Sequence, residues 1–249
     1  MKRRRALLVP LFLLFTPLAA PRAQEGPREP FSVGEKIRYA IIVEGMRIGS
    51  QTMEVSALTE VEGRKAYLIS GRSTTSALFS ILYRLDDKWE VYVDRSSLHP
   101  FRVEKEWAEG KYSGTYVYDI DQEAYLVRLR DMRSGEVKTI NPKNPVFDLF
   151  SLLYFYRSRA HAIQNPFVFD FLESRSVGTV RFQDLGEEDL IVFAISPHRP
   201  SRVRKIKQIG GAGIELYVSS DELRLPLKLL TPAKLSKKKT IDVEFVIDG

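Results

Sequence analysis

Four polar residues recur at every third position of a strongly apolar stretch of the chain. They are Asp148, Ser151, Tyr154 and Arg157. Residues three apart are neighbours on a helix surface, so a helix over residues 146–162 would gather a carboxyl, a hydroxyl, a phenol and a guanidinium along one seam. The seam has two interpretations: it hydrogen-bonds to surrounding strands, or it forms a small ligand-binding site at one mouth of a wrapped sheet.

The other residue types that commonly do chemistry form weaker patterns. The three histidines, His99, His161 and His198, have no acid or cysteine at metal-ligand spacing, so we predict no metal site. The sequence has no G-x-S-x-G element and no glycine-rich phosphate loop before a helix, and we predict no cofactor.

Carboxylates occur in clusters that we expect to lie in solvated turns. A catalytic carboxylate pair stays open, because such pairs meet in space and not in sequence. The sequence therefore favours a non-enzymatic protein and leaves a hydrolase as an alternative. The clusters are Asp86 with Asp87, Asp119 with Asp121, and residues 187–189.

The first 23 residues have the order of a secretory signal peptide. A basic cluster at residues 2–5 precedes an apolar run at residues 6–18, and small residues follow. The run is shorter than the roughly 20 residues that a transmembrane helix needs. We therefore expect export to the periplasm through a Sec-type signal, with cleavage near Ala23.

Removal of this segment changes what the charge implies. Residues 1–23 hold five basic residues and no acidic one, so the net charge falls from +6 to +1. A surface for nucleic acid would leave a clear basic excess, and we predict no nucleic-acid partner. The chain has no cysteine, which excludes disulfides and a lipid anchor on an N-terminal cysteine. Contact with a membrane is then peripheral at most.

The remaining chain predicts a polar linker at residues 24–30 and a single β-rich domain at residues 31–249. Short strand-like runs are separated by turn residues, as in a meander. Residues 76–83 predict a short helical or irregular crossing, and the glycines at 210, 211 and 213 predict a tight turn. The expected strands are 35–44, 51–58, 65–73, 85–94, 101–107, 112–120, 123–132, 167–172, 176–183, 190–195, 203–209, 214–219, 225–230 and 240–247.

One segment interrupts the strands. Asn144 followed by Pro145 predicts a helix start with Asn144 as the N-cap. The predicted helix is apolar nearly all round in its first half, and such a helix is buried on most sides. We therefore predict a mainly β fold: a single strongly curved antiparallel sheet, like half of a barrel, wrapped around the helix at 146–162. Trp89, Trp107 and other aromatic residues either fill the core or line an apolar pocket.

Three segments in order resemble the bacterial exported family of domain of unknown function 3108. The opening carries Gly34, Glu35, Tyr39, Gly45 and Gly49, and the helix carries the D-x-x-S-x-x-Y-x-x-R pattern that begins at Asp148. The ending carries Asp221, Arg224 and Pro226.

The ending departs from the family pattern at two places. Tyr217 stands where tryptophan is expected, and Lys237–Lys239 replaces a glycine between the last two strands. The resemblance implies an exported, mostly antiparallel protein, similar in shape to half-barrel carriers of lipoproteins. We expect Asp221 and Arg224 to act first as turn and register determinants.

Three functions remain open from the sequence. The leading one is a non-enzymatic binding module for an apolar or amphipathic ligand, such as a lipid or a lipoprotein segment. The second is an envelope assembly partner that adds a strand at an exposed sheet edge. The third is a carboxylate-dependent envelope hydrolase. The sequence does not set the oligomeric state.

Overall fold

The structure is a computed structural model that describes residues 30–173, 175–192, 199–211, 213–234 and 240–248. The predicted signal peptide and all but the last residue of the predicted linker lie outside these ranges. So do His198 and Lys237–Lys239.

Strands dominate the described residues, as the turn spacing of the sequence predicts. The first half contains β1 (Lys36–Val43), β2 (Met46–Val61), β3 (Arg64–Thr75), β4 (Asp86–Asp94), β5 (Pro100–Glu109), β6 (Tyr112–Asp121), β7 (Leu126–Asp131) and β8 (Val137–Ile140). The second half contains β9 (Val146–Phe147), β10 (Phe167–Leu172), β11 (Val177–Leu190), β12 (Ser201–Gln208), β13 (Glu215–Ser219), β14 (Pro226–Lys234) and β15 (Thr240–Ile247). The helical elements are α1 (Ala77–Ser80), α2 (Leu149–Arg159) and the 3-10 turn η1 (Ala160–Ala162).

All 15 described strands belong to one sheet. Its order is β8-β7-β6-β5-β4-β3-β2-β1-β15-β14-β13-β12-β11-β10-β9. Two meanders therefore meet where the first strand pairs with the last, with Ile41 opposite Phe245. Neighbouring strands are antiparallel except β9 and β10, which are parallel. The strongly curved antiparallel sheet predicted from the sequence is confirmed, and its two edges are not joined by strand pairing.

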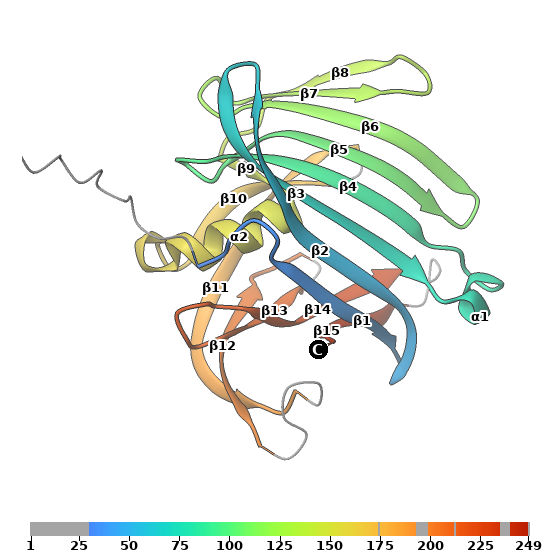
Figure 1. Ribbon diagram of the computed structural model, residues 1–249, viewed down its shortest axis with the longest axis vertical. Coiled ribbons are helices and arrows are strands. Elements are labelled where there is room, and N and C mark those ends of the chain that lie inside the picture. Colours follow the sequence, from blue (N-terminus) through green and yellow to red (C-terminus); the bar gives the residue numbers. More distant parts are fainter. Residues whose placement is uncertain (1–29, 174, 193–198, 212, 235–239, 249) are drawn as a thin grey trace, which may run out of the picture.

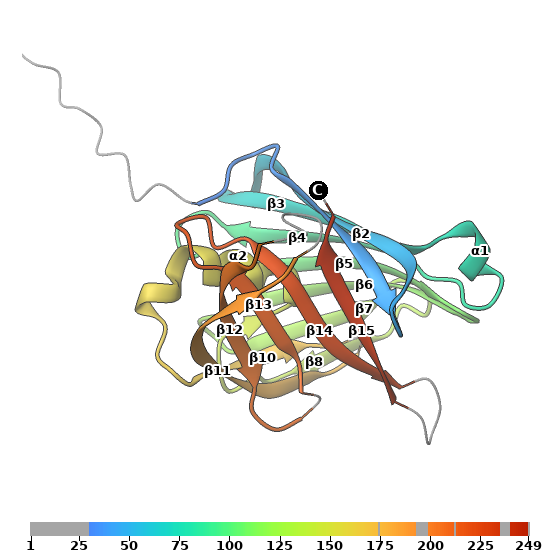
Figure 2. The same ribbon diagram turned by 90° about the horizontal axis from the view of Figure 1, so that it is seen from below.

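Helix α2 lies inside the curve of the sheet, and α1 projects at the opposite end (Figures 1 and 2). Alternate strand residues such as Val91, Val93 and Val103 are buried in one core with the helix. Trp89 stacks on Phe150 of α2, with ring centroids 4.1 Å apart. Trp89 therefore fills the core. Neither α1 nor α2 is long and apolar enough to cross a membrane.

The predicted start of the helix is wrong. Asp148, and not Asn144, is the N-cap, and α2 begins at Leu149. Val146 and Phe147 form strand β9 and pair with Asp170 and Phe171. The sequence pattern of asparagine followed by proline is local, whereas this pairing depends on a strand that lies later in the chain.

Two strand predictions also need correction. Residues 137–140 form β8, which the sequence pattern missed because its side chains are mostly exposed and do not alternate in polarity. Strand β11 runs through residues 177–190 without the break expected before 190. Residues 191 and 192 are not strand, and the rest of the predicted strand at 190–195 lies outside the described residues.

The side chain of Gln122, which follows β6, occupies the free edge of β9. Its Nε2 donates to the carbonyl of Val146 at 2.9 Å, and its Oε1 accepts from the Val146 N–H at 2.9 Å. A side-chain amide thus takes the place of a neighbouring strand. At the other edge, Lys138 of β8 donates to the carbonyl of Arg175 at 3.4 Å, beyond the end of β10. Side-chain contacts therefore bridge the two edges that strand pairing leaves open.

Candidate functional site

The first two residues of the helical seam cap the start of α2. The Asp148 carboxylate accepts from the N–H of Phe150 at 2.8 Å and from the Ser151 hydroxyl at 2.6 Å. The Ser151 hydroxyl oxygen accepts in turn from the Asp148 N–H at 3.1 Å. This reciprocal capping box satisfies donors that a helix start leaves open. Burial raises the pKa of Asp148 above its usual value, while these hydrogen bonds oppose the shift.

Arg157, at the other end of the seam, is a buried charge with several hydrogen-bond partners. Its side chain is 1% exposed. Nη1 and Nη2 donate to the two carboxylate oxygens of Glu35 at 2.6 and 2.9 Å. Nη2 also donates to the carbonyl of Pro30, and Nε donates to the carbonyl of Leu223. The guanidinium therefore ties α2 to the start of β1 and to the turn before β14.

The three sequence motifs that carry the family resemblance meet at this arginine. Glu35 comes from the first motif, Arg157 from the second and Arg224 from the third. Arg224 Nη1 donates to the carbonyl of Arg157 at 2.9 Å. The Tyr39 hydroxyl donates to the carbonyl of Pro226 at 2.9 Å, so the first and third motifs are also joined directly. Although the three motifs are distant in sequence, they form one contact region in the fold.

Tyr154 lies between these groups and the core. Its ring packs edge-on against Phe31, with centroids 4.8 Å apart, and the Arg157 guanidinium lies 5.3 Å from its ring centre. Burial raises the pKa of Tyr154, and the charge of Glu35 adds to the shift. The hydroxyl has no hydrogen-bond partner among the described residues.

The remaining motif residues shape turns. Gly34 and Gly45 have φ of +90° and +76°, which side-chain-bearing residues rarely adopt. A side chain at Gly49 would collide with the Thr74 carbonyl on β3. Asp221 accepts from the N–H of Arg224 at 3.2 Å, in the turn that leads to β14. Turn formation, as expected, is the observed role of Asp221.

The predicted ligand-binding residues are therefore interior residues. Asp148, Ser151, Tyr154 and Arg157 are all buried. Every polar contact described above joins them to other groups of this chain. This arrangement matches the interpretation in which the seam hydrogen-bonds to its surroundings.

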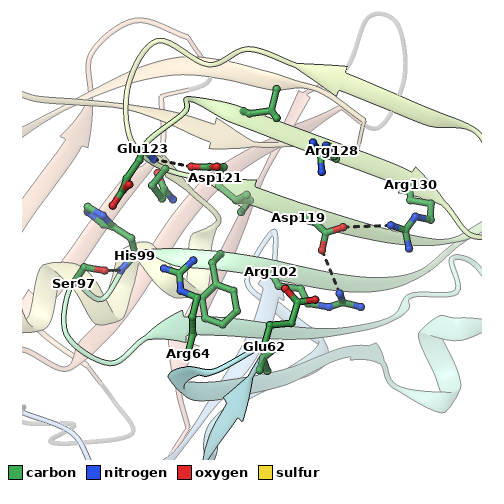
Figure 3. A pocket seen from close by; sticks show the side chains of 15 residues that line it. Glu62, Arg64, Ser97, His99, Arg102, Asp119, Asp121, Glu123, Arg128 and Arg130 are labelled. Atoms are coloured by element: carbon green, nitrogen blue, oxygen red, sulfur yellow. Dashed lines mark hydrogen bonds and ion pairs between the residues drawn. The ribbon is translucent and has the colours of Figure 1, made fainter.

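A groove on the outer face of the sheet was not predicted from the sequence. It has a volume of about 900 Å³ and lies over β5, β6 and β7, beneath the β2–β3 hairpin (Figure 3). Arg102, Asp119 and Arg128 line it, and each alternates with a residue of the core, such as Val103 or Tyr118. Since successive strand residues point to opposite faces, these charged side chains lie on the face away from α2.

The groove lining carries both signs of charge. It contains four arginines, Arg64, Arg102, Arg128 and Arg130, and four acids, Glu62, Asp119, Asp121 and Glu123. Arg102 donates to Asp119 at 3.2 Å, and Arg130 lies 3.5 Å from the same carboxylate (Figure 3). Within the described part of the chain, no carboxylate forms an ion pair with Arg128.

Part of the groove surface is apolar. A β-bulge between Tyr92 and Val93 of β4 places Phe101 beside Tyr92, with ring centroids 6.4 Å apart. The guanidinium of Arg64 lies over the Phe101 ring, 4.5 Å from its centre. Val61 and Leu126 also line the groove. Charged and apolar surfaces are therefore side by side.

The three carboxylate clusters lie on strands and not in the turns expected from the sequence. Asp86 and Asp87 begin β4, Asp119 and Asp121 end β6, and residues 187–189 belong to β11. Cross-strand arginines explain this placement, because Arg72 binds Asp86 and Arg202 binds Glu187. In the groove, Asp119 is engaged by two arginines. Asp121 accepts from the N–H groups of Glu123 and Ala124.

His99 packs among aromatic rings. Its ring stacks on Phe155 and meets Phe147 edge-on, both with centroids 5.2 Å apart. Burial lowers the pKa of His99, so the neutral ring is favoured. Among the described residues, no group of three histidine, aspartate or glutamate side chains is placed to hold a metal ion.

A family model described as "Protein of unknown function (DUF3108)" matches residues 36–241. The chain belongs to this family. The DUF3108 match covers the strands from β1 into β15. It includes the β5–β7 groove, Arg157 and Arg224, and it begins one residue after Glu35. No curated protein is significantly similar to this DUF3108 chain.

Solved structures also resemble the DUF3108 fold. One of them is the crystal structure of a beta-barrel-like protein of domain of unknown function DUF1849 from Brucella abortus, with a TM-score of 0.55 and 8% sequence identity. The alignment covers 85% of this chain and 94% of that chain. At this identity the similarity shows the fold alone.

Proposed function

We propose that this DUF3108 protein is an exported, non-enzymatic binding module of the periplasm. Its ligand is an amphipathic molecule with an anionic head, such as a lipid or the acylated segment of a lipoprotein. The observation that carries this proposal is the outer groove, in which Arg128, an arginine outside the ion pairs of the described residues, lies among charged side chains beside an apolar surface. The signal-peptide pattern of residues 1–23 supports the compartment.

The arginines suit the head of such a ligand. Guanidinium groups bind phosphate and carboxylate through paired, charge-assisted hydrogen bonds. Arg102 and Arg130 are held in place by Asp119, which leaves their remaining N–H groups for a ligand. Arg128 lies on β7 opposite Asp119 of β6, and no ion pair of the described residues includes it, whereas Arg64, Arg102 and Arg130 each have one. A ligand anion would therefore bind at Arg128.

The apolar surface suits the chain of the ligand. Phe101 and Leu126 lie within the same groove as the arginines. Ligand sites commonly combine apolar walls with a few polar groups that fix orientation. A purely inorganic anion would leave this apolar surface in water. The groove therefore favours a molecule that has both an anionic head and an apolar chain.

The two alternatives from the sequence have less support. A hydrolase needs two convergent acids of which one is free to move a proton. In the groove, Asp119 and Asp121 are instead bound by arginines and by backbone N–H groups. Strand addition needs an open sheet edge, and Gln122 occupies the edge of β9.

Isothermal titration with lysophosphatidylglycerol tests the groove. We expect binding that Arg128→Gln weakens about tenfold or more, because a charge-assisted contact contributes about 1.5–3 kcal/mol. Arg38→Gln is the matched control, since Arg38 is an exposed strand arginine outside the groove. Equal affinities for Arg128→Gln and the parent would refute the site. Equally tight binding of inorganic phosphate would refute an amphipathic ligand.

Export is tested separately. Cells expressing the full chain are fractionated, and the amino terminus of the periplasmic form is sequenced. A periplasmic form that begins near Gln24 would support the proposal. A chain that keeps residues 1–23 and stays in the cytoplasm would refute the compartment while leaving the groove assay unaffected.

A further inference from the structure

The connection between β3 and β4 displays large apolar side chains in solvent. Leu78 is 72% exposed, Ile81 is 82% exposed and Leu82 is 83% exposed. Tyr112, at the start of β6, is 78% exposed. An isolated exposed leucine is ordinary, but adjacent exposed apolar side chains mark an interaction surface. We call residues 76–83 together with Tyr112 the apolar tip.

The backbone of the apolar tip is held in a defined shape. The N–H of Ser80 donates to the carbonyl of Ser76 at 2.8 Å, and the N–H of Tyr83 donates to the carbonyl of Phe79 at 2.9 Å. At its base, the N–H of Thr75 donates to the carbonyl of Leu85 at 3.0 Å. A structured turn, anchored in the sheet, therefore presents these side chains outward.

The neighbouring turn brings Tyr112 to the same place. The N–H of Gly110 donates to the carbonyl of Arg84 at 2.8 Å, which joins the β5–β6 turn to the end of the tip. The Tyr83 hydroxyl donates to Glu109 at 3.4 Å across the same junction. The tip is thus assembled from two adjacent turns.

Basic side chains flank the apolar tip, and one acid, Glu109, lies at its base beside Tyr83. Residues 76–83 contain no charged side chain, and exposed Arg84 follows directly. Lys111 precedes Tyr112, and Arg133 donates to Ser113 at 3.0 Å. Among nearby acids, Asp86 is already bound by Arg72 through two hydrogen bonds.

We propose that the apolar tip docks on the surface of an anionic lipid bilayer. Leu78, Ile81 and Leu82 would enter the boundary between head groups and acyl chains. Arg84 and Lys111 would lie against the anionic head groups. Peripheral membrane binding of this kind combines buried apolar area with attraction to anionic lipid.

The shape of the tip favours a lipid surface over a protein partner. Both ribbon views place α1 as a projection at the end of the sheet, away from α2 (Figures 1 and 2). A stable protein interface buries about 800 Å² on each partner over a broad, complementary face. A narrow projection carrying a few side chains offers less than this. A fluid bilayer needs no complementary face.

A fluorescent label at the tip tests the proposal. The chain has no native cysteine, so Leu82→Cys can be labelled uniquely with an environment-sensitive nitrobenzoxadiazole dye. Leu58→Cys is the matched control, because Leu58 is also exposed but lies on the β2–β3 hairpin. We expect phosphatidylglycerol vesicles to shift the emission of the label at 82 to the blue and to leave the label at 58 unchanged. A local label also separates tip docking from any vesicle binding by residues 1–23.

Two sets of variants measure separately how much the basic charge and the apolar side chains contribute to vesicle binding. Each variant carries the dye at a tip position that is not replaced. Arg84→Gln should weaken vesicle binding about fivefold, since a basic residue near an anionic surface contributes about 1 kcal/mol. Replacement of Leu78 and Ile81 by serine should weaken it at least about a hundredfold, because each buried aliphatic side chain contributes about 1.5–3 kcal/mol. The same replacement of Val168 and Leu185, which are exposed on β10 and β11, should have no effect.

Three outcomes would overturn the proposal. The first is an unchanged label at position 82 in the presence of phosphatidylglycerol vesicles. The second is an equal response of labels at 82 and 58. The third is a blue shift that grows with protein concentration without lipid, which would assign the tip to a second copy of the chain. None of these outcomes bears on the groove assay, because the two sites share no residue.

Discussion

The side-chain amide of Gln122 makes with Val146 both hydrogen bonds that a neighbouring strand would make. Donor and acceptor distances are 2.9 Å in each direction. Nε2 also donates to the carbonyl of Pro100 at 2.9 Å, so the amide is fixed from the β5 side as well. An edge strand presents unpaired backbone groups that invite pairing with other chains. Gln122 satisfies these groups at β9 without a further strand.

Loss of this amide should expose the edge of β9. We expect Gln122→Ala to lower the free energy of unfolding by about 1–3 kcal/mol, because the backbone groups of Val146 lose their partners. Urea denaturation followed by circular dichroism measures the change. Gln183→Ala is the control, since Gln183 is exposed on β11. A stability of Gln122→Ala equal to that of the control would show that water replaces the amide at no cost.

A second prediction concerns the pair of Arg157 and Glu35. Replacing one member leaves the other charge buried without a partner, which typically costs about 3–5 kcal/mol. We expect Glu35→Gln to lose about this much stability, because it leaves the Arg157 charge, which is 1% exposed, without its carboxylate. Arg157→Met should lose less, because the remaining Glu35 is 20% exposed and reaches water. Thermal and urea melts of both variants test this order.

The matched control for Arg157 is Arg181→Met, which removes an exposed arginine from β11. A double variant of Glu35 and Arg157 completes a thermodynamic cycle. We expect the double variant to be more stable than the sum of the single losses implies, since neither charge is then left alone. Strict additivity would mean that the two groups do not depend on each other.

Much of the fold follows from local sequence patterns. Alternation of buried and exposed residues, as along Val91, Tyr92 and Val93, predicts a half-buried strand wherever it occurs. The apolar segment around Phe150 predicts a buried helix in the same way. The start of that helix was misplaced because Val146 and Phe147 pair with β10, a contact that no local pattern encodes.

The outer groove could not be predicted in the same way. The alternation of Val127, Arg128, Leu129 and Arg130 shows that the arginines face outward from β7. It does not show that β5 and β6 bring Arg102 to them, because strand order and register are properties of the whole sheet. The contact between Glu35 and Arg157 could not be predicted either, since 122 residues separate them in sequence.

A third prediction separates two roles of Asp148. As the N-cap it needs a hydrogen-bond acceptor, whereas its negative charge is disfavoured by burial, which raises its pKa. Asparagine caps helices about as well as aspartate does. We therefore expect Asp148→Asn to match the parent within about 0.5 kcal/mol, and Asp148→Ala to lose about 1–2 kcal/mol. Urea denaturation at pH 7 measures both.

Ser151→Ala completes this comparison. It removes the hydroxyl that donates to the Asp148 carboxylate at 2.6 Å and accepts from the Asp148 N–H. The hydrogen bonds from the backbone N–H groups of Phe150 and Ser151 to the carboxylate stay in place. We expect a loss between those of the other two variants. If Asp148→Asn is as damaging as Asp148→Ala, the charge itself is required and the capping interpretation fails.

The last prediction concerns Asp87 on β4. Burial raises the pKa of Asp87 to about 7, the N–H of Ala108 opposes this shift by donating at 2.9 Å, and the charge of Glu109 adds to it. The folded state therefore holds a proton on Asp87 at pH values where the unfolded state has released it. Stability from this group is complete below about pH 4 and is lost as the pH rises to about 7.

Neutralising Asp87 should remove this pH dependence. We expect Asp87→Asn to be more stable than the parent by about 1–2 kcal/mol at pH 8, a value discounted because the carboxyl is only half-buried. The advantage should shrink as the pH falls towards 4. Melting temperatures of both proteins between pH 4 and pH 8 measure the difference.

Asp94, on the same strand, provides a control of opposite sign. Although burial opposes ionisation, hydrogen bonds from Ser96 and Ser97 lower the pKa of Asp94 to about 2. Its stabilising effect is therefore present above about pH 4 and is lost as the pH falls towards 2. Asp94→Asn should be less stable than the parent at pH 7 and should approach it in acid. If Asp87→Asn and Asp94→Asn change stability in the same direction across this range, burial does not control the ionisation of Asp87.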